Sequence, residues 1–272
     1  RVAEIYDAAA ARAFGLRREQ VTVMIHSGSR GLGHQVCTDH LKGMLGAASR
    51  YGIELPDRQL ACAPLASPEG RRYLGGMAAA ANFAFANRQV MTHWVRESFA
   101  RVLATPVDQL GIEVVYDVCH NIAKLETFDI GGERRRACVH RKGATRAYPP
   151  GHAQVPHPYR EAGQPVLIPG DMGRYSYVLA GTQKAYEQTF GSACHGAGRR
   201  MSRGEAKKQA RGRNLLDELA AKGVVVMAAG MATVAEEMPE AYKDVADVVD
   251  VVVRAGIARK VARLEPIGVI KG

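Results

Sequence analysis

Apolar and polar positions in this chain follow two periods, one typical of helices and one of strands. The pattern predicts an amphipathic helix over Arg1–Phe14 that ends near Gly15, and another over about His34–Ser49. Alanine-rich sequence after Ser67 predicts a long helix toward Leu103, interrupted by a break. Shorter helices are predicted near Arg203–Arg211, Leu215–Ala221, Val234–Glu237 and Val245–Val253.

Short apolar stretches between these segments are typical of β-strands. Because the helices and strands are mixed without a regular alternation, the pattern predicts an α+β fold. We see no internal repeat, low-complexity linker or sharp domain boundary. The predicted strands are Val21–His26, Ile112–Asn121, Gln164–Ile168, Tyr175–Leu179 and Val224–Met227, and residues 266–272 are expected to be extended.

Serine, proline and glycine mark where two of the helices start. Ser67 is a suitable N-cap, and Pro68 suits the first helical turn. Residues 27–33 form a glycine-rich loop between a predicted strand and a predicted helix, the usual frame for holding a phosphate. Its glycine spacing matches neither the dinucleotide nor the P-loop motif. Inside the long helix, Asn87 is expected to be an ordinary polar group and Trp94 a packing residue.

The composition is that of an ordinary globular protein with an excess of positive charge. The 272 residues include 37 lysines and arginines and 27 acidic residues, for a formal net charge of +10. That charge suits a polyanionic partner such as RNA or a nucleotide, and equally suits plain solubility. No apolar run is long enough to span a membrane. An odd number of cysteines, five, and no signal peptide favour a reduced, cytoplasmic protein.

The stretch Gly191–Arg203 gathers the candidate chemistry around His195. Glycines and alanines surround this histidine, so a phosphate can approach both the imidazole and the backbone. Ser202 and Glu205 fit a capping box that opens a helix, whose N-terminus attracts anions. Two interpretations stay open: a nucleophilic or metal-bound histidine facing a phosphate, or a glycine-rich turn with a hydrogen-bonded histidine. Positive charge follows at Arg199, Arg200 and Arg203.

Two further histidines, His26 and His120, also stand where an apolar segment meets a small or polar loop. That placement suits metal ligands and nucleophiles, because strands hold such side chains rigidly. Cys119 and Cys194 each precede a candidate histidine. Neighbours in a strand face opposite sides, so both thiols are expected to pack in the interior.

Two clusters carry weaker signals. His34, Cys37 and His40 are spaced by three residues, but a zinc site is not favoured because no fourth ligand accompanies them. Residues 131–150 are the most basic region, interleaved with apolar residues, which predicts a strand with its charges on one face. The cations of this region are Arg134, Arg135, Arg136, Arg141, Lys142 and Arg146.

Six segments of the chain, in order, strongly resemble the RtcB family of RNA-splicing ligases. The likeness runs over essentially the whole chain and covers the C-terminal part of that family, whose upstream metal motifs DxGCGM and GNHF are absent here. We therefore expect an upstream part, and residues 1–272 to be the C-terminal portion of one catalytic domain with central sheets flanked by helices. The segments are HSGSRGLGHQ (His26–Gln35), YDVCHN (Tyr116–Asn121), VHRKGATRA (Val139–Ala147), GSACHGAGRRMSR (Gly191–Arg203), EEMPEAYKDV (Glu236–Val245) and PIGVIKG (Pro266–Gly272).

The resemblance implies an RNA ligase. The family uses GTP and Mn²⁺ to join RNA ending in a 2′,3′-cyclic phosphate or 3′-phosphate to RNA with a 5′-hydroxyl, in tRNA splicing and RNA repair. His195 would be the nucleophile that takes GMP, and His26 and His120 would bind manganese. The other metal ligands belong to the upstream motifs, so the isolated chain is expected to bind manganese poorly and to form no GMP adduct. Archease is a partner of some members.

The resemblance also implies contacts to the nucleotide. Asp171 departs from the family, because many members carry serine there, so this chain has an extra carboxylate at that position. Lys271 is penultimate, a position that usually frays, but the apolar run before it argues for a docked terminus. The implied guanine-pocket residues are Tyr242 and Lys271, the nucleotide-contacting residues are Ser176, Asp171, Ala197 and Gly198, and the basic residues near phosphates are Arg30, Lys142 and Arg203.

Two other functions stay open. A manganese-dependent phosphoesterase using the same histidines would form no covalent GMP adduct with labelled GTP. A non-catalytic RNA-binding fragment would shift RNA in the presence of EDTA without ligating it. RNA is the expected partner of the ligase and of the fragment, and no membrane partner is expected.

Overall fold

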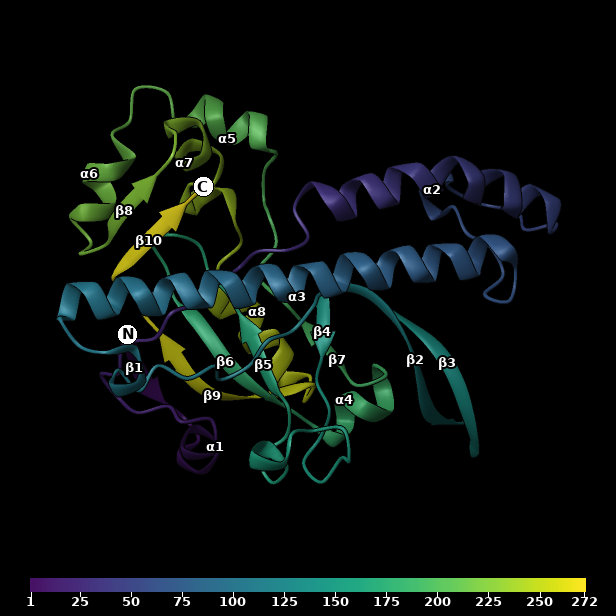
Figure 1. The fold of residues 1–272 in the computed structure, drawn as a ribbon, viewed down its shortest axis with the longest axis horizontal. Helices are drawn as coiled ribbons and strands as arrows, with labels where there is room; N and C mark the ends of the chain where they lie inside the picture. Colours follow the sequence, from purple (N-terminus) through teal and green to yellow (C-terminus); the bar gives the residue numbers. More distant parts are fainter. The chain divides into compact units, whose positions relative to one another are not determined.

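The computed structural model describes residues 1–272, drawn in Figure 1, which divide into two compact units. Unit 1 consists of Arg1–Met24 and Lys124–Gly272, and unit 2 consists of Ile25–Ala123. Helices and strands are mixed along the chain and the largest sheet is antiparallel, which confirms the predicted α+β fold. None of the helices combines the length and the apolar character that crossing a membrane requires.

A four-stranded antiparallel sheet lies at the centre of unit 1, with strand order β1-β9-β6-β5. Strand β6 lies between two partners and is buried from its second residue on, as its nearly continuous apolar sequence requires. The strands are β1 (Val2–Ile5), β5 (Pro165–Ile168), β6 (Ser176–Gly181) and β9 (Ala258–Leu264).

Helix α8 (Val245–Arg254) packs on this sheet through one apolar stripe. Val245, Val249 and Val252 follow one another at spacings of four and three residues, so they share a face of the helix. All three are buried in one cluster with Leu179 of β6. Burying a valine side chain stabilises a fold by about 1.5–3 kcal/mol, so this stripe is enough to fix the helix on the sheet.

Three two-stranded sheets complete the strands. In Figure 1, α5, α6 and α7 gather around β8 and β10, and together they enclose a second core that includes Ala206, Leu219 and Val234. The pairs are β2 (Asn121–Ile130) with β3 (Glu133–Lys142), β4 (Ala144–Arg146) with β7 (Ser192–Cys194), and β8 (Val225–Ala228) with β10 (Gly268–Lys271). The helices are α1 (Ala8–Ala13), α4 (Gln183–Gln188), α5 (Arg203–Gln209), α6 (Leu215–Ala220) and α7 (Met231–Glu236), with 3₁₀ turns at His157–Tyr159 and Pro239–Ala241.

Unit 2 is built on two helices that lie side by side, α2 (Gly31–Arg50) and α3 (Pro68–Leu103) (Figure 1). Helix α3 has 36 residues, a length of about 54 Å at 1.5 Å per residue. The Ser67 hydroxyl caps it by accepting the Gly70 amide at 3.0 Å. Gly70 has no room for a side chain, because a Cβ would lie 2.3 Å from the Pro64 carbonyl oxygen. The 3₁₀ turns of this unit are Arg58–Leu60 and Val107–Gln109.

Most of the predicted elements are confirmed. The long helix starts at Pro68 with the predicted Ser67 cap, although it runs unbroken to Leu103. The basic segment contains the predicted strand, β3, but its charges lie on both faces, because Arg141 is buried while its neighbour Lys142 is exposed. The C-terminal residues form β10. The confirmed set comprises α2, α3, α5, α6, α7 and α8 together with β3, β5, β6, β8 and β10.

Several predictions were wrong, and they concern segments whose structure depends on a distant partner. The first residues form strand β1 rather than a helix, because they pair with β9 near the other end of the chain, and helix α1 begins only at Ala8. Val21–His26 forms no strand, and β2 begins only at Asn121, so residues 112–120 form none either. Trp94 is 62% exposed and is not a packing residue.

Candidate functional site

The predicted site residues fall in both units. Unit 2 holds the two predicted metal ligands, His26 and His120, together with Arg30. Unit 1 holds the predicted nucleophile His195, the predicted nucleotide-contacting residues, and the basic residues Lys142 and Arg203.

In unit 2 the two predicted metal ligands meet. The Nε2 atoms of His26 and His120 lie 3.0 Å apart, with the rings edge to face at 75°. This distance suits a hydrogen bond between two neutral imidazoles. It also suits two ligands of one ion, because two nitrogens each about 2.1 Å from a metal subtend about 90° there, the octahedral angle, when they are 3.0 Å apart.

The pair therefore fits a divalent cation such as manganese as two adjacent ligands. The chain contains no cluster of three or more histidine, cysteine, aspartate or glutamate side chains arranged to hold a metal ion. His26 and His120 would therefore supply two imidazole ligands to an ion. His34, Cys37 and His40 form no such cluster; His40 instead lies against the ring of Tyr73, with centroids 5.5 Å apart.

Arg30 precedes helix α2 in a conformation that non-glycine residues rarely adopt. Its φ is +53° and it stands at the N-cap position without a side-chain cap. Residues in this region cost about 1–3 kcal/mol and gather at functional sites, where surrounding structure holds them. The Arg30 residue is exposed, so its guanidinium is available to an anion.

In unit 1, His195 directly follows β7, which is paired with β4 through Cys194 opposite Ala144. The imidazole is half-buried and lies against the backbone of Gly143. A Cβ on Gly143 would come 3.4 Å from Cε1 and 3.5 Å from Nδ1 of His195. Gly143 has φ +68°, so glycine suits this position for both its backbone and its lack of bulk.

The loop after His195 is tied to the segment that carries Tyr242. The Lys243 amide donates to the Gly198 carbonyl at 3.0 Å, and the Arg200 amide donates to the Ala241 carbonyl at 2.8 Å. Ala197 and Gly198 thus lie in a loop held beside the predicted guanine-pocket tyrosine. Ser202 caps α5 by accepting the Glu205 amide at 3.2 Å, as predicted.

Glu237 contacts the two predicted guanine-pocket residues, and it was not identified from the sequence. The Tyr242 hydroxyl donates to Glu237 Oε2, and Lys271 Nζ lies 3.9 Å from the same oxygen. Arg199 Nη1 donates to Glu237 Oε1 at 3.2 Å and to the Tyr242 hydroxyl at 3.0 Å. Burial and the hydrogen bond to Glu237 raise the pKa of Tyr242 to about 12. Lys271 is docked in β10 opposite Ala228 rather than frayed.

The turn between β5 and β6 holds Asp171 and Ser176. The Ser176 hydroxyl accepts the Gly170 amide at 3.0 Å, and Asp171 Oδ1 accepts the Gly173 amide at 2.9 Å. Asp171 Oδ2 also lies 3.6 Å from Arg174, and the side chain is only 1% exposed. Burial raises the pKa of the Asp171 carboxyl. The Asp171 carboxylate therefore makes these contacts inside its own turn.

The two basic residues of unit 1 are open to solvent. Lys142 is exposed at the last position of β3. Arg203 opens α5 with a side chain that is 72% exposed, and its guanidinium lies 3.7 Å from Glu236. Both can offer positive charge to a phosphate.

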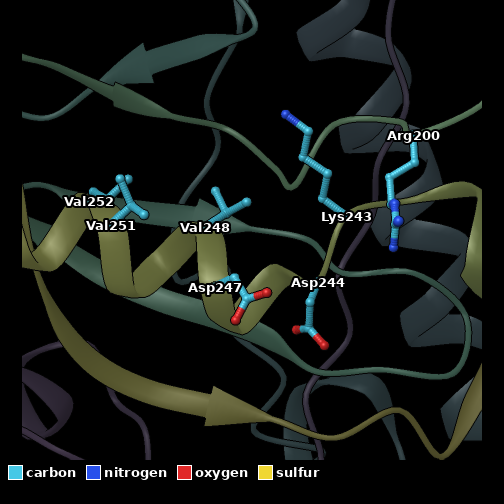
Figure 2. A pocket seen from close by; sticks show the side chains of 7 residues that line it. All are labelled: Arg200, Lys243, Asp244, Asp247, Val248, Val251 and Val252. Carbon is cyan, nitrogen blue, oxygen red and sulfur yellow. The ribbon is translucent and has the colours of Figure 1, made fainter.

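A groove of about 460 Å³ runs along α8, and Figure 2 shows its lining. Arg200 and Lys243 stand at one end, while the valines follow α8 away from them. The predicted site residues do not line the groove, although Arg200 and Lys243 are sequence neighbours of Arg199 and Tyr242. Its lining residues are Arg200, Lys243, Asp244, Asp247, Val248, Val251 and Val252.

The chain is similar to known proteins over its whole length, which includes the segments that carry these residues. The chain is 58% identical over 271 residues to a protein of Archaeoglobus fulgidus named tRNA-splicing ligase RtcB, covering 100% of this chain and 56% of that protein. Proteins of the same name from Pyrococcus furiosus and Methanococcus maripaludis are 57% and 54% identical, with 28% and 56% of their lengths covered. The chain thus spans about half the length, or less, of these relatives. The family described as tRNA-splicing ligase RtcB matches residues 1–272, and the chain belongs to that RtcB family.

Proposed function

We propose that the chain carries the nucleophile and part of the metal and nucleotide sites of a GTP- and manganese-dependent RNA ligase. The observation that carries the proposal is His195, half-buried against the backbone of Gly143 and followed by an arginine-rich loop, in a chain of the RtcB family. The relatives' name, tRNA-splicing ligase, supports RNA as the substrate. The excess of ten positive charges agrees with a polyanion.

His195 would act by covalent catalysis. A ring nitrogen attacks the α-phosphorus of GTP, forming a P–N bond while the P–O bond to pyrophosphate breaks. An oxygen of the 3′-phosphate at one RNA end then attacks the same phosphorus, so that the P–N bond breaks, the imidazole is released and the activated 3′-phosphate becomes a good electrophile. The 5′-hydroxyl of the other end attacks, a phosphodiester forms and GMP leaves. A 2′,3′-cyclic phosphate is first opened to a 3′-phosphate.

The surrounding residues would hold and orient the nucleotide. His26 and His120 would contribute two ligands to manganese, which when bound neutralises phosphate charge and favours departure of the leaving group. Tyr242 and Lys271 would face the guanine, and Ser176 would contact the nucleotide. Lys142 and Arg203 would offset charge during phosphoryl transfer.

Labelling with GTP tests the proposal. Incubated with α-labelled GTP and manganese, the full-length protein that contains this chain should form an acid-labile, alkali-stable GMP adduct. His195→Ala should abolish the adduct and the ligation of RNA. His157→Ala removes an exposed histidine from the same unit and should leave both intact. An adduct that persists in His195→Ala would refute the assignment, and no adduct in the unmodified protein would favour a phosphoesterase.

A further inference from the structure

Two neighbouring side chains of α3, Asn87 and Arg88, hold the segments that carry the histidine pair of unit 2. The Asn87 amide donates to the Ser27 hydroxyl at 3.0 Å and to the Gly28 carbonyl at 2.9 Å. Arg88 Nη1 donates to the carbonyl of Ser27 at 3.1 Å. Ser27 directly follows His26, so both side chains of the helix hydrogen-bond to the segment next to the first histidine.

Arg88 reaches the second histidine segment with its remaining donors. Its Nε donates to Asp117 Oδ1 at 2.6 Å, and its Nη2 lies 3.8 Å from the Sγ of Cys119, the residue before His120. One guanidinium therefore contacts both segments, at Ser27 next to His26 and at Cys119 next to His120. The planar fork of arginine suits this task because its donors point in fixed, different directions.

The bridge matters because no sheet holds these segments. Residues 21–26 and 112–120 form no strand, so they lack the regular hydrogen-bond ladder that would fix their spacing. Arg88 supplies a fixed point in its place. It is only 8% exposed, and its guanidinium carbon lies 4.6 Å from the centre of the Phe85 ring. A buried, paired and stacked arginine is far less mobile than an exposed one.

We propose that Arg88, assisted by Asn87, is a positioning residue that sets the separation of His26 and His120 and thereby the affinity of this pair for a divalent cation. The inference rests on the proposed metal role of the two histidines. Groups that orient metal ligands without touching the metal typically change metal affinity by about 10–100-fold when they are removed. Arg88 would act in this way through the Ser27 carbonyl next to His26 and through the side chains of Asp117 and Cys119 near His120.

Binding of Mn²⁺ alone, followed by the electron paramagnetic resonance of the free ion, tests the inference in the full-length protein without GTP or RNA. Arg88→Ala should weaken binding by about 10–100-fold. Arg88→Lys should also weaken binding, because one ammonium group cannot reach the three separate acceptors that the guanidinium contacts. Asn87→Ala keeps the arginine and should cause a smaller loss, which provides a second test if Arg88→Ala does not fold.

Arg96→Ala is the matched control. Arg96 also lies on α3, and its Nε donates to the carbonyl of Ile112 at 3.0 Å, so it contacts the second segment at a residue eight positions before His120 rather than next to it. Its loss should leave manganese affinity within about twofold, whereas a general weakening of the unit would lower affinity in both variants. Equal losses in Arg96→Ala and Arg88→Ala, or unchanged affinity in Arg88→Ala, would overturn the inference.

His26→Ala separates failure of the inference from failure of the metal site itself. If His26→Ala binds manganese as tightly as the unmodified protein, the proposed metal role of the pair is wrong. A second readout needs no metal: the ring proton resonances of His26 and His120 should shift in Arg88→Ala and stay unchanged in Arg96→Ala. Unshifted resonances in Arg88→Ala would overturn the positioning role independently of any ion.

Discussion

Arg141 and Glu126 face each other from neighbouring strands and form an ion pair in which the two side chains are 2% and 4% exposed. The pair is bidentate, with Arg141 Nη1 and Nη2 donating to the two carboxylate oxygens at 3.0 and 2.8 Å. Arg141 also donates to the Ser192 hydroxyl at 2.9 Å and to the Phe190 carbonyl at 2.9 Å. The β2–β3 hairpin is thereby fastened to the strand that leads into His195.

Arg141→Met should destabilise the protein strongly, because it leaves the Glu126 carboxylate buried without its charged partner. Removing one member of a buried pair typically costs about 3–5 kcal/mol, measured here by urea unfolding. Arg135→Met removes an arginine of the same strand whose pair with Glu133 is exposed, and it should cost less than about 1 kcal/mol. Similar losses in the two variants would show that the buried pair contributes nothing special.

Lys142 and Arg146 should differ in their effect on RNA binding, although both belong to the basic segment. Lys142 is exposed, whereas Arg146 donates to Gln164 at 3.2 Å and to Gln154 at 2.9 Å and lies 4.8 Å from the centre of the Tyr148 ring. Lys142→Ala should reduce the slope of log K against log salt by about one unit. Arg146→Ala should lower thermal stability with little change in slope. Fluorescence anisotropy of labelled RNA at several KCl concentrations measures the slope, and identical slopes in the two variants would contradict this distinction.

Gly143→Ala should slow formation of the proposed GMP adduct on His195. The substitution places a methyl group 3.4 Å from the imidazole in a backbone conformation with φ +68°. Gly131→Ala is the matched control, because Gly131 has φ +62° and a Cβ there would meet no atom within 4 Å. Both variants should lose about 1–2 kcal/mol of stability from the left-handed conformation, and only Gly143→Ala should slow labelling. Equal labelling rates would mean that the glycine serves the turn alone.

The sequence pattern correctly predicted those elements whose structure is determined by residues close to one another in the sequence. The valines of α8 repeat at helical spacing, and Ser67 and Pro68 mark the start of α3, so both helices can be recognised from nearby residues. Strand β1 cannot, because its pairing with β9 depends on residues about 260 positions away. The same reason explains why Val21–His26, although apolar and alternating, forms no strand: Val21 and Val23 are about half exposed and no strand pairs with them.

The site was predictable to the extent that single residues signal chemistry. His26 and His120 were identified by their place at the ends of apolar segments, and the structure brings them to 3.0 Å. Arg88 and Glu237 were missed because their contacts with the candidate residues cross the fold and are not marked by sequence spacing. No signal in the sequence marked Arg88, because α3 carries other arginines, such as Arg96 and Arg101, whose sequence surroundings do not set them apart from it. Asn87, expected to be an ordinary polar group, gave no signal at all.

Tyr242 should make stability depend on pH in the alkaline range. Its pKa rises from 10 in the unfolded chain to about 12, first because of burial and then because of the bond to Glu237. The folded state therefore holds the phenolic proton more tightly, so the stabilisation is complete below pH 10 and is lost as pH rises from 10 toward 12.

The difference in unfolding free energy between the protein and Tyr242→Phe should be constant from pH 7 to 9. Above pH 10 it should fall by at most about 1.4 kcal/mol per pH unit. Urea unfolding at pH 8, 10 and 11 measures it, with Tyr51→Phe as the control for an exposed tyrosine. A difference that stays flat to pH 11 would show that Glu237 and burial do not hold this proton.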